Sequence, residues 1–337
     1  REAICDAFGL DMRLSEEYAE ALRIRWESLG REMPQSNYRQ AEYPAGAEML
    51  PNPKGTAPGL ALLANETQVF ALPGVPEEML YLLQREVLPR LLARRGEDSV
   101  VHSRILRSWG RSEAQVGELL DDLYRGKTNP SIAFLASAGE IKVRITAKAP
   151  DREAAEALIE PVDAEVRRRL GNSVFGRDEE TVHAIIARDL IEKGWTIGTA
   201  ESATGGLVAA ELSSLAGSSA YFRGSVVAYT SDLKESLLGM GSVAQVSEET
   251  ALSMAVGARK TLGVDVAIAV VGSAGPDPLE QPVGTMMVAI ATPEGEQAHT
   301  LRLPGDRERV RIYATTGALH LARLAIEGRW WSPGRVV

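Results

Sequence analysis

The fold of this chain is decided by Thr196-Ile-Gly-Thr-Ala-Glu-Ser-Ala-Thr-Gly-Gly-Leu-Val-Ala-Ala-Glu-Leu212, which predicts a short strand, a tight turn and a helix. The turn carries Glu201, Ser202 and Thr204, and two glycines then open the helix. The first backbone N–H groups of a helix lack partners within it, and the helix dipole places positive charge there. Such a turn can hold a phosphate or a developing oxyanion. Its serine is therefore a nucleophile, a phosphate ligand or only a helix cap.

A second strand and loop of the same kind follow downstream. Asp265–Val271 is a continuous apolar run, typical of a strand that is buried on both faces, and Gly272-Ser-Ala-Gly-Pro276 comes directly after it. Open α/β sheets bind ligands at the carboxyl ends of their central strands. We therefore expect the two loops to meet at one edge of an α/β sheet.

The chain is too long for one ordinary domain, because its 337 residues predict two or three. Residues 1–98 alternate helices with short strands and predict an α/β domain. Residues 99–171 predict a small α+β domain whose residues suggest no chemistry, and residues 172–337 hold the two strand-and-loop units. The expected fold class is therefore α/β and multidomain.

Composition restricts the class of protein. The chain has 37 basic and 46 acidic residues, a net charge of −9, which argues against a general nucleic-acid binder. Cys5 is the only cysteine, so an intrachain disulfide and a multi-cysteine metal site are excluded, and a cytoplasmic location is expected. No apolar run reaches the roughly 18–20 residues of a membrane span. The first residue is not Met, and we expect that the chain starts inside a larger gene product.

A serine needs a base if it is to attack a carbonyl carbon. No histidine lies near Ser202 in sequence, and the four histidines read as structural residues of strands and helices. Tyr229 ends a predicted strand and Lys234 starts the next helix, so both side chains can converge on one point. Burial and a helix N-terminus both disfavour the lysine cation, and a neutral amine can accept a proton. On residue types alone, however, a strand-end tyrosine and a surface lysine are the simpler explanation of the pair.

The remaining polar candidates favour an anionic ligand. The loop Gly272-Ser-Ala-Gly-Pro276 offers bare backbone N–H groups, and Arg307 supplies a guanidinium suited to phosphate or carboxylate. Glycine turns are also common as purely structural features, so neither loop is specific by itself.

These segments together resemble the competence/damage-inducible CinA family. The C-terminal part is similar to the family's nicotinamide mononucleotide deamidase domain, an α/β three-layer domain. Its matching segments are Ala200-Glu-Ser-Ala-Thr-Gly-Gly206, Gly217-Ser-Ser-Ala-Tyr-Phe222, Val227-Ala-Tyr-Thr-Ser-Asp-Leu-Lys234, Gly272-Ser-Ala-Gly-Pro276, Pro282-Val-Gly-Thr285 and Pro304-Gly-Asp-Arg307. The first domain resembles the family's molybdopterin-binding-like domain through Gly30–Asn37, Pro51–Gly59 and Leu72–Met79. The middle domain is similar too.

The resemblance implies an amidohydrolase that converts nicotinamide mononucleotide and water to nicotinate mononucleotide and ammonia, a step of NAD salvage. It assigns catalysis to Ser202, Tyr229 and Lys234 and needs no metal or other cofactor for that step. The substrate-binding residues that it suggests, together with the two loops, are Glu201, Thr204, Gly205, Gly206, Gly272, Ser273, Gly275 and Arg307. Backbone N–H groups near Thr204–Gly206 are expected to hold the oxyanion or the phosphate. The expected partners are a nucleotide substrate and a second copy of the chain in a homodimer, with no membrane.

Three departures from the family pattern matter. Ala203 stands where the family usually has Cys, and Val271 stands where it usually has Thr, so one polar contact is missing from the expected site. The third departure is the absence of the first part of the molybdopterin-binding-like domain, with its Gly-Gly-Leu-Gly-Pro-Thr loop and acidic residues. The family's metal-dependent ADP-ribose pyrophosphatase activity is therefore not expected here, although an intact parent could use a divalent metal. A non-catalytic nucleotide-binding scaffold, favoured by Val271, is the remaining alternative.

Overall fold

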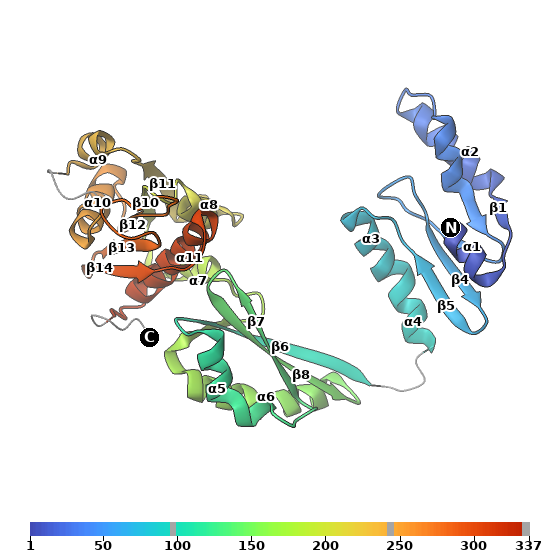
Figure 1. Cartoon of the computed structure of the whole chain (residues 1–337), viewed down its shortest axis with the longest axis horizontal. Coiled ribbons are helices and arrows are strands. Elements are labelled where there is room, and N and C mark those ends of the chain that lie inside the picture. The colour runs from blue at the N-terminus through green and yellow to red at the C-terminus, as the bar shows by residue number, and fades with distance from the viewer. Residues whose placement is uncertain (95–98, 241–245, 332–337) are drawn as a thin grey trace. The chain divides into compact units, whose positions relative to one another are not determined.

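The computed structural model describes residues 1–94, 99–240 and 246–331, and it divides the chain into two compact units, Arg1–Asp98 and Ser99–Val337 (Figure 1). The expected mixed α/β, multidomain class is confirmed. The expected division into three domains stays a prediction. None of the helices in the described ranges is long and apolar enough to cross a membrane.

The first unit combines helices with two small antiparallel sheets. The sheets have the strand orders β1-β2 and β3-β4-β5, and Leu50, Ala61 and Leu82 form a buried cluster beneath the larger one. The elements are α1 (Glu2–Phe8), β1 (Met12–Leu14), α2 (Glu16–Ser28), η1 (Gln35–Ala41), β2 (Glu42–Pro44), β3 (Glu48–Leu50), β4 (Gly59–Ala64), β5 (Thr67–Ala71), α3 (Pro76–Leu82), η2 (Leu83–Val87) and α4 (Leu88–Arg94).

The second unit begins with a four-stranded antiparallel sheet of order β7-β8-β6-β9. Its elements are β6 (Val100–Trp109), α5 (Glu113–Tyr124), β7 (Ser131–Ser137), β8 (Glu140–Ala149), α6 (Arg152–Leu170), η3 (Gly171–Ser173) and β9 (Val174–Arg177). Because β9 pairs with β6, this sheet extends beyond residue 171.

The two faces of this middle sheet differ. Along β8 every second residue, from Ile141 to Ala149, is buried against α5 and α6. The intervening residues, including Lys142 and Arg144, therefore face the opposite side of the sheet.

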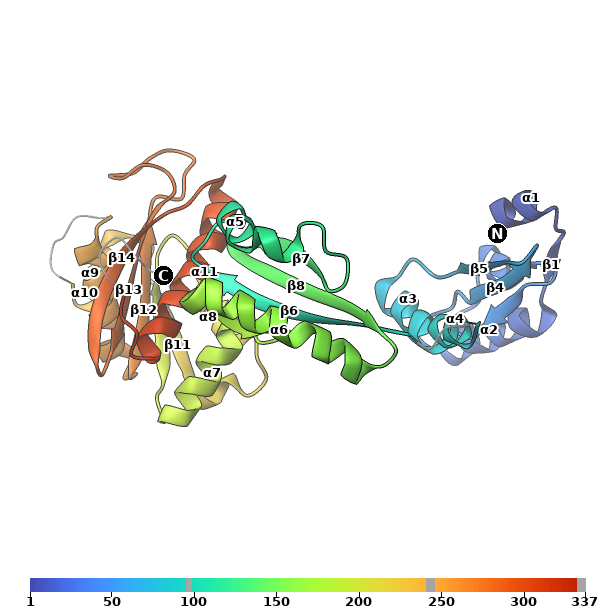
Figure 2. The same cartoon turned by 90° about the horizontal axis from the view of Figure 1, so that it is seen from below.

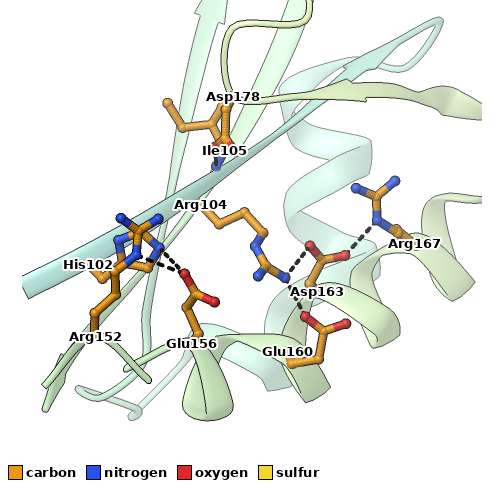
Figure 3. A network of polar contacts seen from close by, with 9 residues as sticks. All are labelled: His102, Arg104, Ile105, Arg152, Glu156, Glu160, Asp163, Arg167 and Asp178. Atoms are coloured by element: carbon orange, nitrogen blue, oxygen red, sulfur yellow. Dashed lines mark hydrogen bonds and ion pairs between the residues drawn. The ribbon is translucent and has the colours of Figure 1, made fainter. Parts of the chain in front are cut away.

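A polar network joins β6 to α6 on the helix-covered face (Figure 3). The Arg104 guanidinium contacts the carboxylates of Glu160 at 2.6 Å and Asp163 at 3.0 Å, and Arg167 donates to Asp163 at 2.6 Å. Asp163 is buried, and a buried carboxylate is costly unless it is paired. The two arginines supply that pairing and hold the helix at a fixed register on the sheet.

The rest of the second unit has a five-stranded sheet of order β11-β10-β12-β13-β14, in which β10 runs parallel to β11 and β12 and the other pairs are antiparallel. The elements are α7 (Val182–Lys193), β10 (Ile197–Glu201), α8 (Leu207–Ser213), η4 (Ser218–Ala220), β11 (Phe222–Val227), α9 (Ser231–Leu238), α10 (Glu248–Leu262), β12 (Val266–Gly272), β13 (Thr285–Thr292), β14 (Gly295–Arg302) and α11 (Arg307–Ile326).

This sheet is the middle of three layers, as the sequence predicts. One buried cluster lies between the sheet and α7, α8 and α11, and a second lies between the sheet and α9 and α10. Figure 2 shows α11 and α10 on opposite sides of the strands. Every residue of β12 and β13 is buried, as expected for strands covered on both faces.

Helix α11 also joins this layer to the middle sheet. His320, which is fully buried, stacks on the ring of Trp109 with the ring centroids 4.7 Å apart. Its Nε2 lies 2.9 Å from Oε1 of Glu140, at the start of β8. Burial lowers the pKa of His320 to about 4, against the opposing effect of Glu140. The imidazole is therefore neutral at pH 7.

Candidate active site

The turn after β10 fixes Ser202 at the carboxyl end of a central strand. The Ser202 N–H donates to the Val270 carbonyl of neighbouring β12 at 3.0 Å, and Gly205 N–H donates to the Ser202 carbonyl at 3.1 Å. The second contact closes a tight turn, and Gly205 and Gly206 both have positive φ, at 62° and 99°. Other residues are strained in that conformation, so the two glycines are needed to make this turn.

The sequence predicts that Glu201 binds substrate, but in the structure its side chain contacts the start of α8. Its buried carboxylate accepts from the N–H groups of Gly206 at 2.9 Å, Val208 at 3.1 Å and Ala209 at 2.8 Å. The Thr199 hydroxyl donates to it as well, at 3.0 Å. The carboxylate thus occupies the start of α8, where an oxyanion was expected. Glu201 caps this helix, and the N–H of Gly206 is not available to a substrate.

Arg311 of α11 holds the other side of the turn. Its Nε donates to the Ala203 carbonyl at 3.1 Å and its Nη2 to the Thr204 carbonyl at 2.8 Å. Thr204 is fully buried, and its hydroxyl has no hydrogen-bond partner among the described residues. The two residues that follow Ser202 are therefore held through their backbone rather than through their side chains.

Ser202 lines a cavity of about 200 Å³ together with the proposed catalytic pair. We call this the Ser202 cavity. Its walls come from the ends of β10 and β12, from the residues around the start of α9, and from the start of α11. The lining residues are Ser202, Ala203, Tyr229, Lys234, Val246, Val271, Gly272, Ala274, Gly275, Asp277, Leu279 and Arg307.

Lys234 is the most buried cation of this cavity. It lies in α9 with only 8% of its surface exposed. Burial lowers the pKa of the Lys234 ammonium, and the carboxylate of Glu280 opposes that shift. Glu280 is itself engaged, since it accepts from the Val246 N–H at 3.0 Å. A lysine with a lowered pKa exists more often as the neutral amine, which is the form that can accept a proton.

Tyr229 and Arg307 form a hydrogen-bonded pair at the cavity. Arg307 donates from Nη2 to the Tyr229 phenol oxygen at 2.8 Å and from Nη1 to the Gly275 carbonyl at 2.5 Å. One lone pair of the phenol is thereby occupied, so the phenol directs its own proton elsewhere. Tyr229 is 54% exposed, which fits a residue at the open side of the cavity rather than at its floor.

The loop after β12 forms a tightly packed wall of the cavity. A Cβ on Gly272 would lie 2.5 Å from the Thr285 carbonyl oxygen, and Gly275 has φ of 84°. Both positions therefore require glycine. Ser273 is buried away from the cavity, where its hydroxyl accepts from the Leu279 N–H at 3.2 Å. Val271 gives the cavity an apolar wall.

The structure brings together part of the predicted set. Six predicted residues line the Ser202 cavity: Ser202, Tyr229, Lys234, Gly272, Gly275 and Arg307. Five do not line it and instead shape or support the loops: Glu201, Thr204, Gly205, Gly206 and Ser273. The prediction that N–H groups near Thr204–Gly206 hold an oxyanion is corrected for Gly205 and Gly206, because both donate within the turn.

Sequence reasoning missed Asp277 and Arg311. Asp277 lines the cavity directly after the Gly275–Pro276 pair, and an acidic residue in a glycine loop was the available signal. Arg311 lies in the middle of a helical pattern, and nothing in its neighbourhood in the sequence pointed to a turn about a hundred residues earlier. Among the described residues, no cluster of three or more His, Cys, Asp or Glu side chains could hold a metal ion.

Comparisons with known proteins point to one family. Residues 179–326 match the family model described as CinA C-terminal domain, and residues 103–176 match the damage-inducible protein CinA KH domain. The chain is 42% identical over 342 residues to a CinA-like protein of Frankia casuarinae, covering 97% of this chain and 79% of that protein. A CinA-like protein of Geobacter metallireducens is 40% identical over 328 residues, covering 95% and 79%.

Among solved structures, the competence damage-inducible protein A of Klebsiella pneumoniae is 33% identical, with a TM-score of 0.42, and it covers 43% of this chain and 95% of its own. The curated relatives span most of the chain at about 40% identity, and two family models cover both regions of the second unit. The chain therefore belongs to the CinA family.

Proposed function

We propose that the chain is an amidohydrolase that converts nicotinamide mononucleotide and water to nicotinate mononucleotide and ammonia. One observation carries the proposal: a serine hydroxyl and a buried lysine with a lowered pKa line the same cavity. A serine that shares a cavity with a lysine of lowered pKa can lose its proton to the amine, and this route needs no histidine. Tyr229, held by Arg307, completes the set of proton-carrying groups.

In the first half of the reaction, Ser202 Oγ attacks the carboxamide carbon and its proton passes to the Lys234 amine, directly or through the Tyr229 phenol. The tetrahedral intermediate then collapses. The C–N bond breaks, the lysine returns the proton to the departing nitrogen, and ammonia leaves. An ester links the nicotinoyl group to Ser202.

In the second half, water attacks that ester. Lys234 takes a proton from the water and delivers it to Ser202 Oγ as the ester bond breaks. The product leaves as the carboxylic acid, which ionises by releasing its proton to solvent, and the enzyme is restored. One water is consumed and one ammonia is released per cycle.

The negative charge that develops on the carboxamide oxygen needs hydrogen-bond donors. Ala203, Ala274 and Gly275 line the cavity, and within the described ranges their N–H groups have no backbone or side-chain acceptor. We assign the oxyanion to this set, with Ala203 N–H first because it directly follows the nucleophile. A donor in that position stabilises the transition state more than the substrate.

The size of the cavity limits what enters it. About 200 Å³ is less than the roughly 300–1,000 Å³ of pockets that enclose drug-sized ligands. The pyridine carboxamide is therefore expected to enter, while the ribose phosphate stays at the open side near the exposed guanidinium of Arg307. A phosphate there would accept from the guanidinium N–H groups that are not used by the bonds to Tyr229 and Gly275.

The test is ammonia release from nicotinamide mononucleotide, measured beside calorimetric binding of the same compound to the full chain. Turnover by the wild type and loss of turnover in Ser202→Ala, with the fold intact, supports the proposal. Binding without ammonia release would instead identify a nucleotide-binding scaffold. Metal-dependent formation of AMP from ADP-ribose, with no ammonia release, would identify the pyrophosphatase alternative.

A further inference from the structure

A second cavity of about 210 Å³ lies where the middle sheet meets the C-terminal layers. We call it the seam cavity. One side is formed by the open face of the middle sheet, and the other by α7, α8 and α11. The lining residues are Arg107, Ser137, Ala138, Glu140, Lys142, Thr181, Val182, His183, Leu207, Glu211, Ile312, Thr315, Thr316 and Leu319.

Two cations lie directly opposite each other on this sheet. Arg107 of β6 and Lys142 of β8 are register partners, so their side chains leave the same face as close neighbours. Like charges in that position destabilise a sheet. Arg107 is only 8% exposed, so water screens this repulsion poorly. Arg107 is already matched by carboxylate oxygens of Glu140 at 3.8 Å and Glu179 at 3.9 Å, and its Nε donates to the Asp178 carbonyl at 2.7 Å. An anion here would therefore act mainly on Lys142, with Arg107 beside it.

The other charged groups of the cavity are already paired. Glu140 has one oxygen 2.9 Å from the His320 ring and the other 3.8 Å from Arg107. Glu211 faces His183, with 3.4 Å between the carboxylate oxygen and Nδ1. Over the described stretches of the chain, the Lys142 ammonium has neither an ion pair nor a hydrogen bond. Lys142 is thus the cation of this lining that no carboxylate in the described ranges matches.

The remaining walls are apolar or weakly polar. Val182, Leu207, Ile312 and Leu319 lie on the side formed by the helices, and the Thr316 hydroxyl has no partner among the described residues. A ligand that fits must combine one negative charge with an apolar body. It must also be smaller than a mononucleotide, because the volume is below that of pockets for larger ligands.

We propose that the seam cavity binds a small organic monocarboxylate, with its carboxylate at Lys142 and Arg107 and its apolar body against α8 and α11. The site is separate from the Ser202 cavity, with which it shares no lining residue. The proposal does not depend on the proposed deamidase activity, since it concerns binding alone.

The test uses benzoate as the probe and calorimetry on the full chain. Benzoate is expected to bind one to one, and benzamide, which has the same shape without the charge, at least tenfold more weakly. Lys142→Gln should weaken benzoate binding at least tenfold. Arg144→Gln removes a cation from the same strand and face outside the cavity, so it should leave the affinity within twofold.

Further binding measurements can overturn the proposal. Ser202→Ala should keep benzoate binding, and a loss there would place the probe in the Ser202 cavity. Absence of saturable binding at millimolar benzoate, or equal affinity in wild type and Lys142→Gln, would refute the seam site. Inorganic phosphate that binds as tightly as benzoate would refute the monocarboxylate class. Circular dichroism of each variant excludes unfolding as the cause of a loss.

Discussion

The Ser202 cavity and the seam cavity have nearly the same volume, about 200 and 210 Å³, but they are built differently. The first gathers loops that leave neighbouring strands of one sheet, so topology alone brings its residues together. The second forms only where the face of one sheet meets helices that cover another. A site at strand ends can be inferred from loops along the chain, whereas a site at a seam depends on a docking geometry that no local pattern encodes.

The largest expected effect is the loss of catalysis when the serine of the Ser202 cavity is removed. Ser202→Ala should lower kcat for ammonia release by about 10³-fold or more, because loss of a nucleophile removes the covalent route. Ser213→Ala is the matched control, since that exposed hydroxyl only bonds to carbonyls of its own helix. Residual turnover above a tenth of the wild-type value would show that Ser202 is not the nucleophile.

The next effect tests Lys234 as the base. The kcat/KM of the wild type should rise with pH as the ammonium loses its proton, with an apparent pKa below the ordinary 10.5. Lys234→Met should lose about 10²–10⁴-fold and flatten this rise. Glu280→Gln removes the carboxylate that favours the charged amine, so it should move the apparent pKa of Lys234 further down. A profile unchanged in both variants would contradict the assignment.

A third prediction concerns His320, which joins α11 to the middle sheet, and the pH dependence of the free energy of unfolding. The folded-state pKa of His320 is about 4, below the ordinary 6.5, so between these values the unfolded chain binds more protons. Stability should therefore fall as pH drops from 6.5 to 4, by about 3 kcal/mol in total from this group. Urea unfolding of wild type and His320→Gln across this range measures the difference in slope. Equal slopes would mean that His320 takes up its proton without unfolding.

The smallest effect tests the apolar wall of the Ser202 cavity. Val271→Thr restores the residue that the family usually has and adds one hydroxyl to the cavity, so kcat/KM should rise by less than about tenfold, or 1.4 kcal/mol. Val270→Thr is the control, because Val270 packs in the cluster on the opposite face of the sheet. That variant should lose stability without a gain in activity.

Much of the fold was predictable from the sequence because the signals were local. The apolar runs before Ser202 and Gly272 predicted two central strands, and both became parallel neighbours in the sheet. The role of Glu201 was not predictable, since an acidic residue beside a helix start can face a ligand or cap the helix. The place of Tyr229 and Lys234 in one cavity was expected from their positions about a strand–helix turn, while their roles remain predictions. Lys142 gave no signal, because its significance comes from its cross-strand neighbour.

The two hydrogen bonds of Arg311 also bear on how the protein is made. The turn that presents Ser202 receives them from a residue synthesised 107 to 108 positions later. Ribosomes add about 5–20 residues per second, so the nascent chain spends several seconds with the serine turn exposed but unsupported. The turn that carries Ser202 therefore reaches its final geometry only after α11 has emerged and folded onto the sheet. The site is therefore completed late in the synthesis of the chain.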